Sequence, residues 1–202
     1  MAVHGLHIGD RLHRSHGAAV PAVKDAAATA VTAREVAVAA LRIGTGFVFL
    51  WAFLDKMFGL GYSTAAGKAW IHGGSPTKGF LAGVNAGPFT SMFHHIAGQG
   101  WADWLFMLGL LGIGVALVLG FGVRIAAVAG LVLVAMMWAA VWPLAQHASD
   151  GSLTGSTNPF VDEHVMDALA LIVIGVAGAG SRLGLGALWA RLPFVQRHPV
   201  LL

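Results

Sequence analysis

Four ionisable residues lie close together in the stretch NPFVDEHVMDALALIVIGVAGAG, residues 158–180: Asp162, Glu163, His164 and Asp167. On a helix, Asp167 shares a face with Glu163 and with His164, because side chains three and four positions apart are neighbours. A histidine beside carboxylates in a partly dry site can take up and release protons near neutral pH. We therefore predict that Glu163, His164 and Asp167 form a catalytic group that handles protons.

Helix capping is the alternative explanation for this cluster. Acidic residues are favoured at a helix N-terminus, which accounts for Asp162 and Glu163. Capping gives no reason for His164. It explains Asp167 poorly, because that carboxylate lies deepest along the helix and must either hold a proton or have a cationic partner such as Lys56.

The composition defines the environment in which this chemistry would operate. Of the 202 residues, 57 % are hydrophobic and 10 % charged, whereas soluble domains contain about 25 % charged residues. The composition indicates an integral membrane protein, and the lack of a basic stripe with interleaved aromatics argues against nucleic-acid binding. Cysteine is absent, which excludes disulfides, cysteine-ligated iron–sulfur clusters and cysteine nucleophiles. A redox role would need a quinone, another organic cofactor, or a metal held by histidine and carboxylate.

Hydropathy predicts the elements that position the cluster. A membrane-spanning helix needs about 20 mostly apolar residues, and residues 36–54, 104–123 and 125–144 satisfy this requirement. The motif "LGFGVR", with Gly120 and Gly122, predicts a tight turn between the second and third spans. A fourth helix must start near Pro159, because its uncharged part is too short to cross alone. We predict an all-α, four-helix transmembrane bundle. The expected organisation is a flexible cytoplasmic segment at 1–32, the membrane domain at 33–190 and a cytoplasmic C-terminal tail at 191–202.

The distribution of Lys and Arg predicts the orientation. With four crossings, eight basic residues fall on the side of both termini, and Lys56, Lys68 and Lys78 fall on the other. The positive-inside rule then places both termini in the cytoplasm of a plasma-membrane protein. The long connection 55–103 lies outside, where "GGSPTKGFLAG" and "GPFTSMFHHIAG" predict two short amphipathic helices that start at Pro76 and Pro88.

Four further residues are predicted to bind a substrate or quinone. Arg42 lies inside the first span, where it either snorkels to the cytoplasmic surface or holds an acid or a ligand oxygen. Lys56 ends that span, and His147 follows the third. Trp142 belongs either to the aromatic belt at the membrane interface or to the wall of a pocket for a flat ring. No metal site is expected, because the adjacent histidines His94 and His95 point in different directions on a helix.

Three motifs resemble the DoxX/DoxD-like membrane family: "LRIGTGFVFLWAFLDKMFG" in the first helix, "KAWIHGGSPTKGFLAG" in the outer loop and "NPFVDEHVMDALALIVIGVAGAGSRLGLGALW" in the fourth helix. The resemblance covers about residues 34–189, and the fourth-helix motif is its most specific part. It implies a membrane-bound thiosulfate:quinone oxidoreductase that forms tetrathionate and passes electrons to the quinone pool. Arg42, Lys56, Glu163 and His164 match motif positions. The family enzyme has two subunits, so the resemblance also implies a protein partner.

Several functions remain open at this stage. The first hypothesis is a subunit of a quinone-linked oxidoreductase, with quinone as electron acceptor and no tightly bound cofactor. The second is a non-catalytic anchor or assembly subunit for a soluble redox partner. A small-solute transporter is a third hypothesis, although four spans show no inverted repeat. A haem held by His147 and His164 is a fourth hypothesis.

Overall fold

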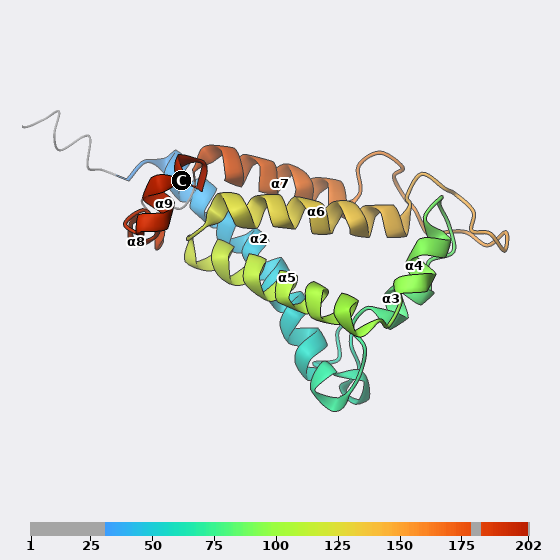
Figure 1. Ribbon diagram of the computed structural model, residues 1–202. Coiled ribbons are helices and arrows are strands. Elements are labelled where there is room, and N and C mark those ends of the chain that lie inside the picture. Colours follow the sequence, from blue (N-terminus) through green and yellow to red (C-terminus); the bar gives the residue numbers. More distant parts are fainter. Residues whose placement is uncertain (1–30, 179–182, 202) are drawn as a thin grey trace, which may run out of the picture. The chain divides into compact units, whose positions relative to one another are not determined.

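The described part of the chain is all-helical. The computed structural model describes residues 31–178 and 183–201, which form helices, turns and one isolated bridge between His147 and Leu153, with no strand among them (Figure 1). The predicted all-α class is confirmed for these residues. The expected N-terminal segment 1–32, apart from its last two residues, lies outside the described residues. The four longest helices are α2 (Ala33–Phe58), α5 (Gly100–Leu119), α6 (Val123–Val141) and α7 (Glu163–Ala177).

Three of these helices are suited to a membrane. Helices α2, α5 and α6 are each long and apolar enough to cross a bilayer. Large apolar side chains on them point outward, including Phe47, Leu108 and Val132, which are more than half exposed. A lipid environment would cover such faces. Helix α7 has 15 residues, which rise about 22 Å, less than the roughly 30 Å of a hydrocarbon core.

The three apolar helices begin earlier than the spans that hydropathy predicts, and α5 and α6 also end three or four residues earlier, at Leu119 and Val141. Helix α2 starts before residue 36 and includes Asp55 and Lys56 in its last turns. Helix α5 starts at Gly100, so Asp103 lies in its first turn. An acidic side chain is favourable there, because the first turn of a helix carries a partial positive charge.

A glycine turn joins α5 to α6, as the motif "LGFGVR" predicts. Gly120 and Gly122 have φ angles of 76° and 55°, a region that glycine enters without steric cost. The N–H groups of Gly120 and Phe121 donate to the carbonyl of Ala116. This left-handed cap ends α5 and reverses the chain at once into α6.

Two glycines bring α2 against α5. A Cβ atom added at Gly46 would lie 2.7 Å from the Cβ of Leu117, and one added at Gly114 would lie 2.7 Å from the main-chain nitrogen of Leu50. Small residues allow helices to approach this closely in a bilayer, where packing drives association. By contrast, a Cβ at Gly112 would meet nothing within 4 Å.

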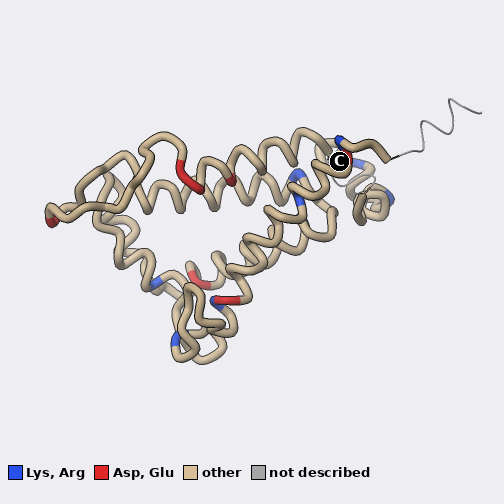
Figure 2. The backbone as a smooth tube through the Cα atoms, turned by 180° about the vertical axis from the view of Figure 1, so that it is seen from behind, with Lys and Arg blue, Asp and Glu red and all other residues tan. Residues whose placement is uncertain are grey.

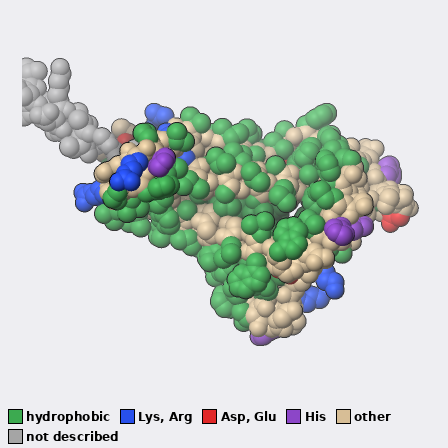
Figure 3. All heavy atoms as spheres, viewed as in Figure 1, with side chains coloured by type: hydrophobic (Ala, Val, Ile, Leu, Met, Phe, Trp, Pro, Cys, Tyr) green, Lys and Arg blue, Asp and Glu red, His purple; other side chains and the backbone are tan. Residues whose placement is uncertain are grey.

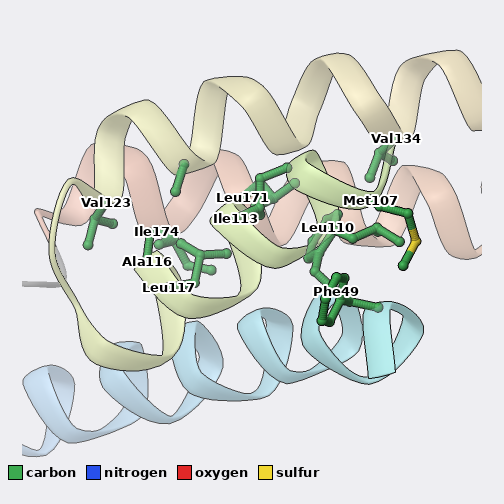
Figure 4. Packing of buried hydrophobic residues seen from close by; sticks show 12 residues of the cluster. Phe49, Met107, Leu110, Ile113, Ala116, Leu117, Val123, Val134, Leu171 and Ile174 are labelled. Atoms are coloured by element: carbon green, nitrogen blue, oxygen red, sulfur yellow. The ribbon is translucent and has the colours of Figure 1, made fainter. Parts of the chain in front are cut away.

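One apolar core joins all four long helices (Figure 4). Phe49 of α2, Leu110 and Leu117 of α5 and Leu171 of α7 are buried in it. Helix α2 packs mainly on α5 and α6 mainly on α7, and α5–α6 and α2–α7 contacts connect the two pairs. The core therefore fixes the start of α7 relative to the end of α6.

The connection between α2 and α5 contains two short helices, as predicted. It contains the 3-10 turns η1 (Ala66–Lys68) and η2 (Trp70–His72) and the helices α3 (Lys78–Ala82) and α4 (Thr90–Ile96). Each of the two helices begins two residues after the proline that was predicted to open it. Phe93 of α4 is buried with Val84 against Ala140 of α6, so α3 and α4 lie between the start of α5 and the end of α6 (Figure 1).

Candidate functional site at the start of helix α7

The compact unit 33–202 has two chemically different ends. We call the end with Gly120–Gly122 the turn end, and the end with residues 142–163 the loop end. The acidic residues of α7 and of residues 142–163 lie at the loop end, away from the glycine turn (Figure 2). The predicted proton-handling residues therefore lie at the loop end.

Helix α7 begins later than the sequence predicts. The side-chain oxygen of Asn158 accepts hydrogen bonds from the N–H groups of Phe160 and Val161, at 3.0 and 3.1 Å. These bonds fold the N-P-F sequence into a turn, since asparagine competes with helix by bonding the main chain two residues on. The first helical residue is Glu163. The prediction of a helix start near Pro159 was wrong for this reason.

Asp162 links the helix cap to the histidine. One oxygen of its carboxylate accepts the N–H of Val165 at 3.0 Å, which makes Asp162 the N-cap of α7. The other oxygen lies 2.8 Å from Nδ1 of His164, whose ring is buried. Capping by Asp162, the alternative explanation of the cluster, is confirmed, but capping alone gave no reason for His164. The structure shows that the cap carboxylate also orients the imidazole.

The contact between Asp162 and His164 determines which ring nitrogen of His164 carries the hydrogen. Burial raises the pKa of the Asp162 carboxyl, but hydrogen bonds from His164 and from the N–H of Val165 outweigh burial and bring that pKa below its ordinary value. An ionised Asp162 can only accept, so Nδ1 of His164 carries the hydrogen. Nε2 is then the ring atom that can accept a proton. The pair can work as an oriented base or acid.

A recess of about 230 Å³ lies beside the cap. Two carboxylates, several hydroxyl and amide groups and an apolar wall line it: Asp162, Glu163, Thr154, Ser156, Thr157, Asn158, Gly155, Val141 and Pro143. Ligand pockets usually measure about 300–1,000 Å³, so this recess admits only a small group. The predicted catalytic residue Glu163 contributes to it and is exposed.

Asp167 is separate from the recess. It lies one turn further along α7 and is half-buried, with no hydrogen bond or ion pair to another described residue. The cation suggested as its partner, Lys56, donates instead to the hydroxyl of Ser63 at 3.3 Å. The three predicted catalytic residues thus occupy one helix end, but only Glu163 lines the recess.

Arg42 lies toward the turn end and binds the main chain. Its guanidinium is fully buried and donates to the carbonyls of Leu117 at 2.7 Å and Leu183 at 2.6 Å. Neither snorkelling nor contact with an acid is observed among the described residues. The carbonyl of Leu117 belongs to the last turn of α5, where carbonyl groups have no N–H partner within the helix. Arg42 therefore acts as a side-chain cap for α5.

Trp142 and His147 do not contribute side chains to the recess. Trp142 caps α6 with a φ of 46°, which is uncommon for a bulky residue. Its ring contacts Trp138 at 5.5 Å and Phe89 at 6.2 Å between centroids. His147 is exposed and pairs with Leu153 only through the main chain. The structure does not bring Arg42, Lys56, Trp142 and His147 into one site.

Two carboxylates that matter structurally were not singled out by the sequence. Asp55 is buried and accepts from the hydroxyl of Ser63 at 2.6 Å and from its N–H at 3.0 Å. Asp103 is buried and accepts from the hydroxyl of Thr77 at 2.6 Å and of Ser75 at 2.9 Å. Both carboxylates fasten the α2–α5 connection to the helix ends. The available signal was the position of each acid at the edge of an apolar span, where an ionisable side chain needs a partner.

Comparisons with known proteins give no relative. No match to this chain was found among protein-family models, curated proteins or solved structures. The resemblance to the DoxX/DoxD-like family therefore stays a prediction from the three quoted motifs.

Proposed function

We propose that this chain is the membrane subunit of a DoxX/DoxD-like, quinone-linked oxidoreductase in which the Asp162–His164 pair moves protons. The observation that carries the proposal is the 2.8 Å contact between Asp162 and a buried imidazole beside a polar recess. The electron donor in this proposal is thiosulfate or a similar sulfur anion, as the motif resemblance suggests. The acceptor is the quinone pool.

The proposed architecture is a four-helix bundle with α7 as the fourth crossing. Leu169, Ile172 and Val176 on α7 are each about half exposed or more, which is what lipid contact requires. The charged first turn of α7 then lies at the membrane interface. The distribution of Lys and Arg supports a plasma-membrane location with both termini in the cytoplasm and the loop end outside.

The recess suits part of a quinone. Hydroxyl and amide groups such as those of Thr157 and Asn158 can donate to quinone oxygens, and the apolar wall at Val141 suits a ring. The volume admits the ring and excludes a long tail, which would remain in lipid. Two carboxylates disfavour an anion here, so we place the sulfur anion near Lys56 instead.

The electron and proton balance explains why a histidine is needed. Oxidation of two thiosulfate ions to one tetrathionate releases two electrons and no proton. Reduction of quinone to quinol takes up those two electrons and two protons, so both protons must come from water. Nε2 of His164 is the oriented atom that can pass them on, with Asp162 holding the ring in place.

The test is quinone reduction by protein purified anaerobically in mild detergent, with thiosulfate as donor. His164→Gln and Asp162→Asn should lower the rate by about a hundredfold, the usual contribution of general acid–base catalysis. Asp150→Asn is the matched control, because Asp150 is an exposed acid in the same loop region. Wild-type rates in the His164→Gln variant would refute the proposal.

A second candidate is a non-catalytic anchor for a soluble redox partner. Three buried charged residues favour this candidate, because their side chains are hydrogen-bonded to other groups of the protein: Arg42, Asp55 and Asp103. It predicts a co-purifying redox protein and no quinone reduction by the isolated chain. Activity of the isolated chain that depends on His164 would exclude it.

A further inference from the structure

The C-terminal segment 185–201 is folded onto the turn end. It forms α8 (Gly186–Trp189), α9 (Pro193–Arg197) and the 3-10 turn η3 (Pro199–Leu201), whereas the sequence predicted only a tail from residue 191. The N–H of Leu185 donates to the carbonyl of Leu119 at 2.9 Å. The indole of Trp189 donates to the carbonyl of Leu201 at 3.0 Å, and the guanidinium of Arg124 to that of Val200 at 3.3 Å. These bonds hold the segment beside the α5–α6 turn.

The free face of this segment is apolar. Leu188 of α8 is 57 % exposed and Phe194 of α9 is 63 % exposed, whereas Val195 of α9 is fully buried. A short amphipathic segment that buries one side chain and leaves larger apolar ones outside is suited to a second apolar environment. Ile125 and Val128 at the start of α6 are also exposed.

The charge within this segment is entirely basic. Arg191 and Arg197 are exposed within the segment, and Arg124 is exposed next to it. Residues 168–202 contain no Asp or Glu. In the space-filling view, Lys, Arg and His side chains lie among hydrophobic ones at this end (Figure 3). Basic and apolar groups on one short amphipathic element match the boundary between anionic headgroups and acyl chains.

We propose that segment 185–201 docks on the membrane surface at the turn end and binds anionic phospholipid headgroups. The apolar side chains enter the headgroup boundary, and Arg191, Arg197 and Arg124 bind the phosphates. An anionic surface attracts each basic side chain by about 1 kcal/mol, equivalent to about fivefold in the docking equilibrium. The proposal is independent of the redox function, because it uses none of the residues at the loop end.

The test is amide hydrogen exchange of the full-length protein in nanodiscs. One set contains phosphatidylcholine only, and the other also contains anionic phosphatidylglycerol. Exchange of residues 185–201 should be slower in the anionic nanodiscs, and salt should remove the difference by screening. Arg191→Gln together with Arg197→Gln should reduce the lipid-dependent protection by about 25-fold, or about fivefold for each arginine.

The control variant carries Lys68→Gln and Lys78→Gln, the same change in net charge in the α2–α5 connection. It should keep the wild-type lipid dependence. A further variant, Leu188→Ser with Phe194→Ser, should lose protection in both kinds of nanodisc, because the apolar contact is common to both. Equal exchange of wild type in the two lipids would overturn the proposal. Protection that appears only when a soluble protein is added would instead assign this surface to a protein partner.

Discussion

The turn end and the loop end of this molecule both hold ionisable side chains, and they use them in opposite ways. At the turn end, Arg42 is completely buried and surrounded by main-chain carbonyls. At the loop end, Asp162 and His164 bind each other beside a recess that opens to the surface. A guanidinium stays protonated in proteins, whereas an imidazole changes its charge near neutral pH.

The difference teaches which buried polar groups can support chemistry. The two terminal nitrogens of Arg42 donate to the carbonyls of Leu117 and Leu183, so they hold α2 against α5 and against residue 183, while the buried Nε has no partner among the described residues. The Asp162–His164 pair commits only one ring nitrogen. An imidazole with one uncommitted nitrogen can take up and release a proton, whereas a buried guanidinium keeps its charge. The first role is structural, and the second suits catalysis.

The largest expected effect is at the turn end. Arg42→Met leaves the buried carbonyl of Leu117 and the part-buried carbonyl of Leu183 without their donor, and each buried unsatisfied group costs about 1–3 kcal/mol. We expect the free energy of unfolding to fall by about 4 kcal/mol, measured by thermal unfolding in detergent. Arg34→Met is the matched control, because Arg34 lies on the same helix and is exposed. An equal loss in both variants would show that the carbonyl contacts are not the cause.

The next largest effect on stability is expected where α2, the helix that contains Arg42, packs against α5. Gly46 lies one turn after Arg42, and a Cβ there would meet Leu117 and the main chain of Val118. Gly46→Ala should therefore destabilise the protein by about 1–3 kcal/mol through overpacking. Gly44→Ala has open space and should be neutral or stabilising by up to about 1 kcal/mol, from helix propensity. Thermal unfolding of the pair checks the difference. Similar midpoints would mean that α2 and α5 are not in close contact.

The sequence predicted the elements with strong periodic or turn signals. Three long apolar helices, the turn at Gly120 and Gly122, and two short helices in the α2–α5 connection are all present. These features depend on local composition and on the conformational freedom of glycine. The capping role of Asp162 follows from the same local rules.

Features that depend on distant partners were not predicted. Arg42 is paired with Leu117 and Leu183, which are far away in sequence and offer only main-chain oxygens. Such acceptors leave no mark on a sequence, because every residue has one. The roles of Asp55 and Asp103 were missed for a related reason. Their donors are ordinary loop hydroxyls and N–H groups, which become partners only after the loop has folded back.

At the loop end, the expected effect on stability is smaller and depends on pH. Asparagine caps a helix about as well as aspartate, so Asp162→Asn removes mainly the charge. We expect it to lower the free energy of unfolding by up to about 1 kcal/mol at neutral pH. Because the folded-state pKa of Asp162 is depressed, its contribution is present above the pKa of the unfolded chain. It is lost as the pH falls through the lower folded-state pKa. Unfolding curves of wild type and variant should therefore converge in acid, and a constant offset would contradict this.

The smallest expected effect on stability distinguishes chemistry from structure at the same helix end. Glu163 is exposed and has no hydrogen-bond or ion-pair partner in the described part of the chain. Glu163→Gln should therefore change the free energy of unfolding by less than about 0.5 kcal/mol. Because Glu163 lines the recess, a lower rate of quinone reduction in this variant would come from lost chemistry and not from unfolding. An unchanged rate would leave proton transfer to the Asp162–His164 pair alone, whereas a lowered unfolding midpoint would show that the loop end also uses its charges for structure.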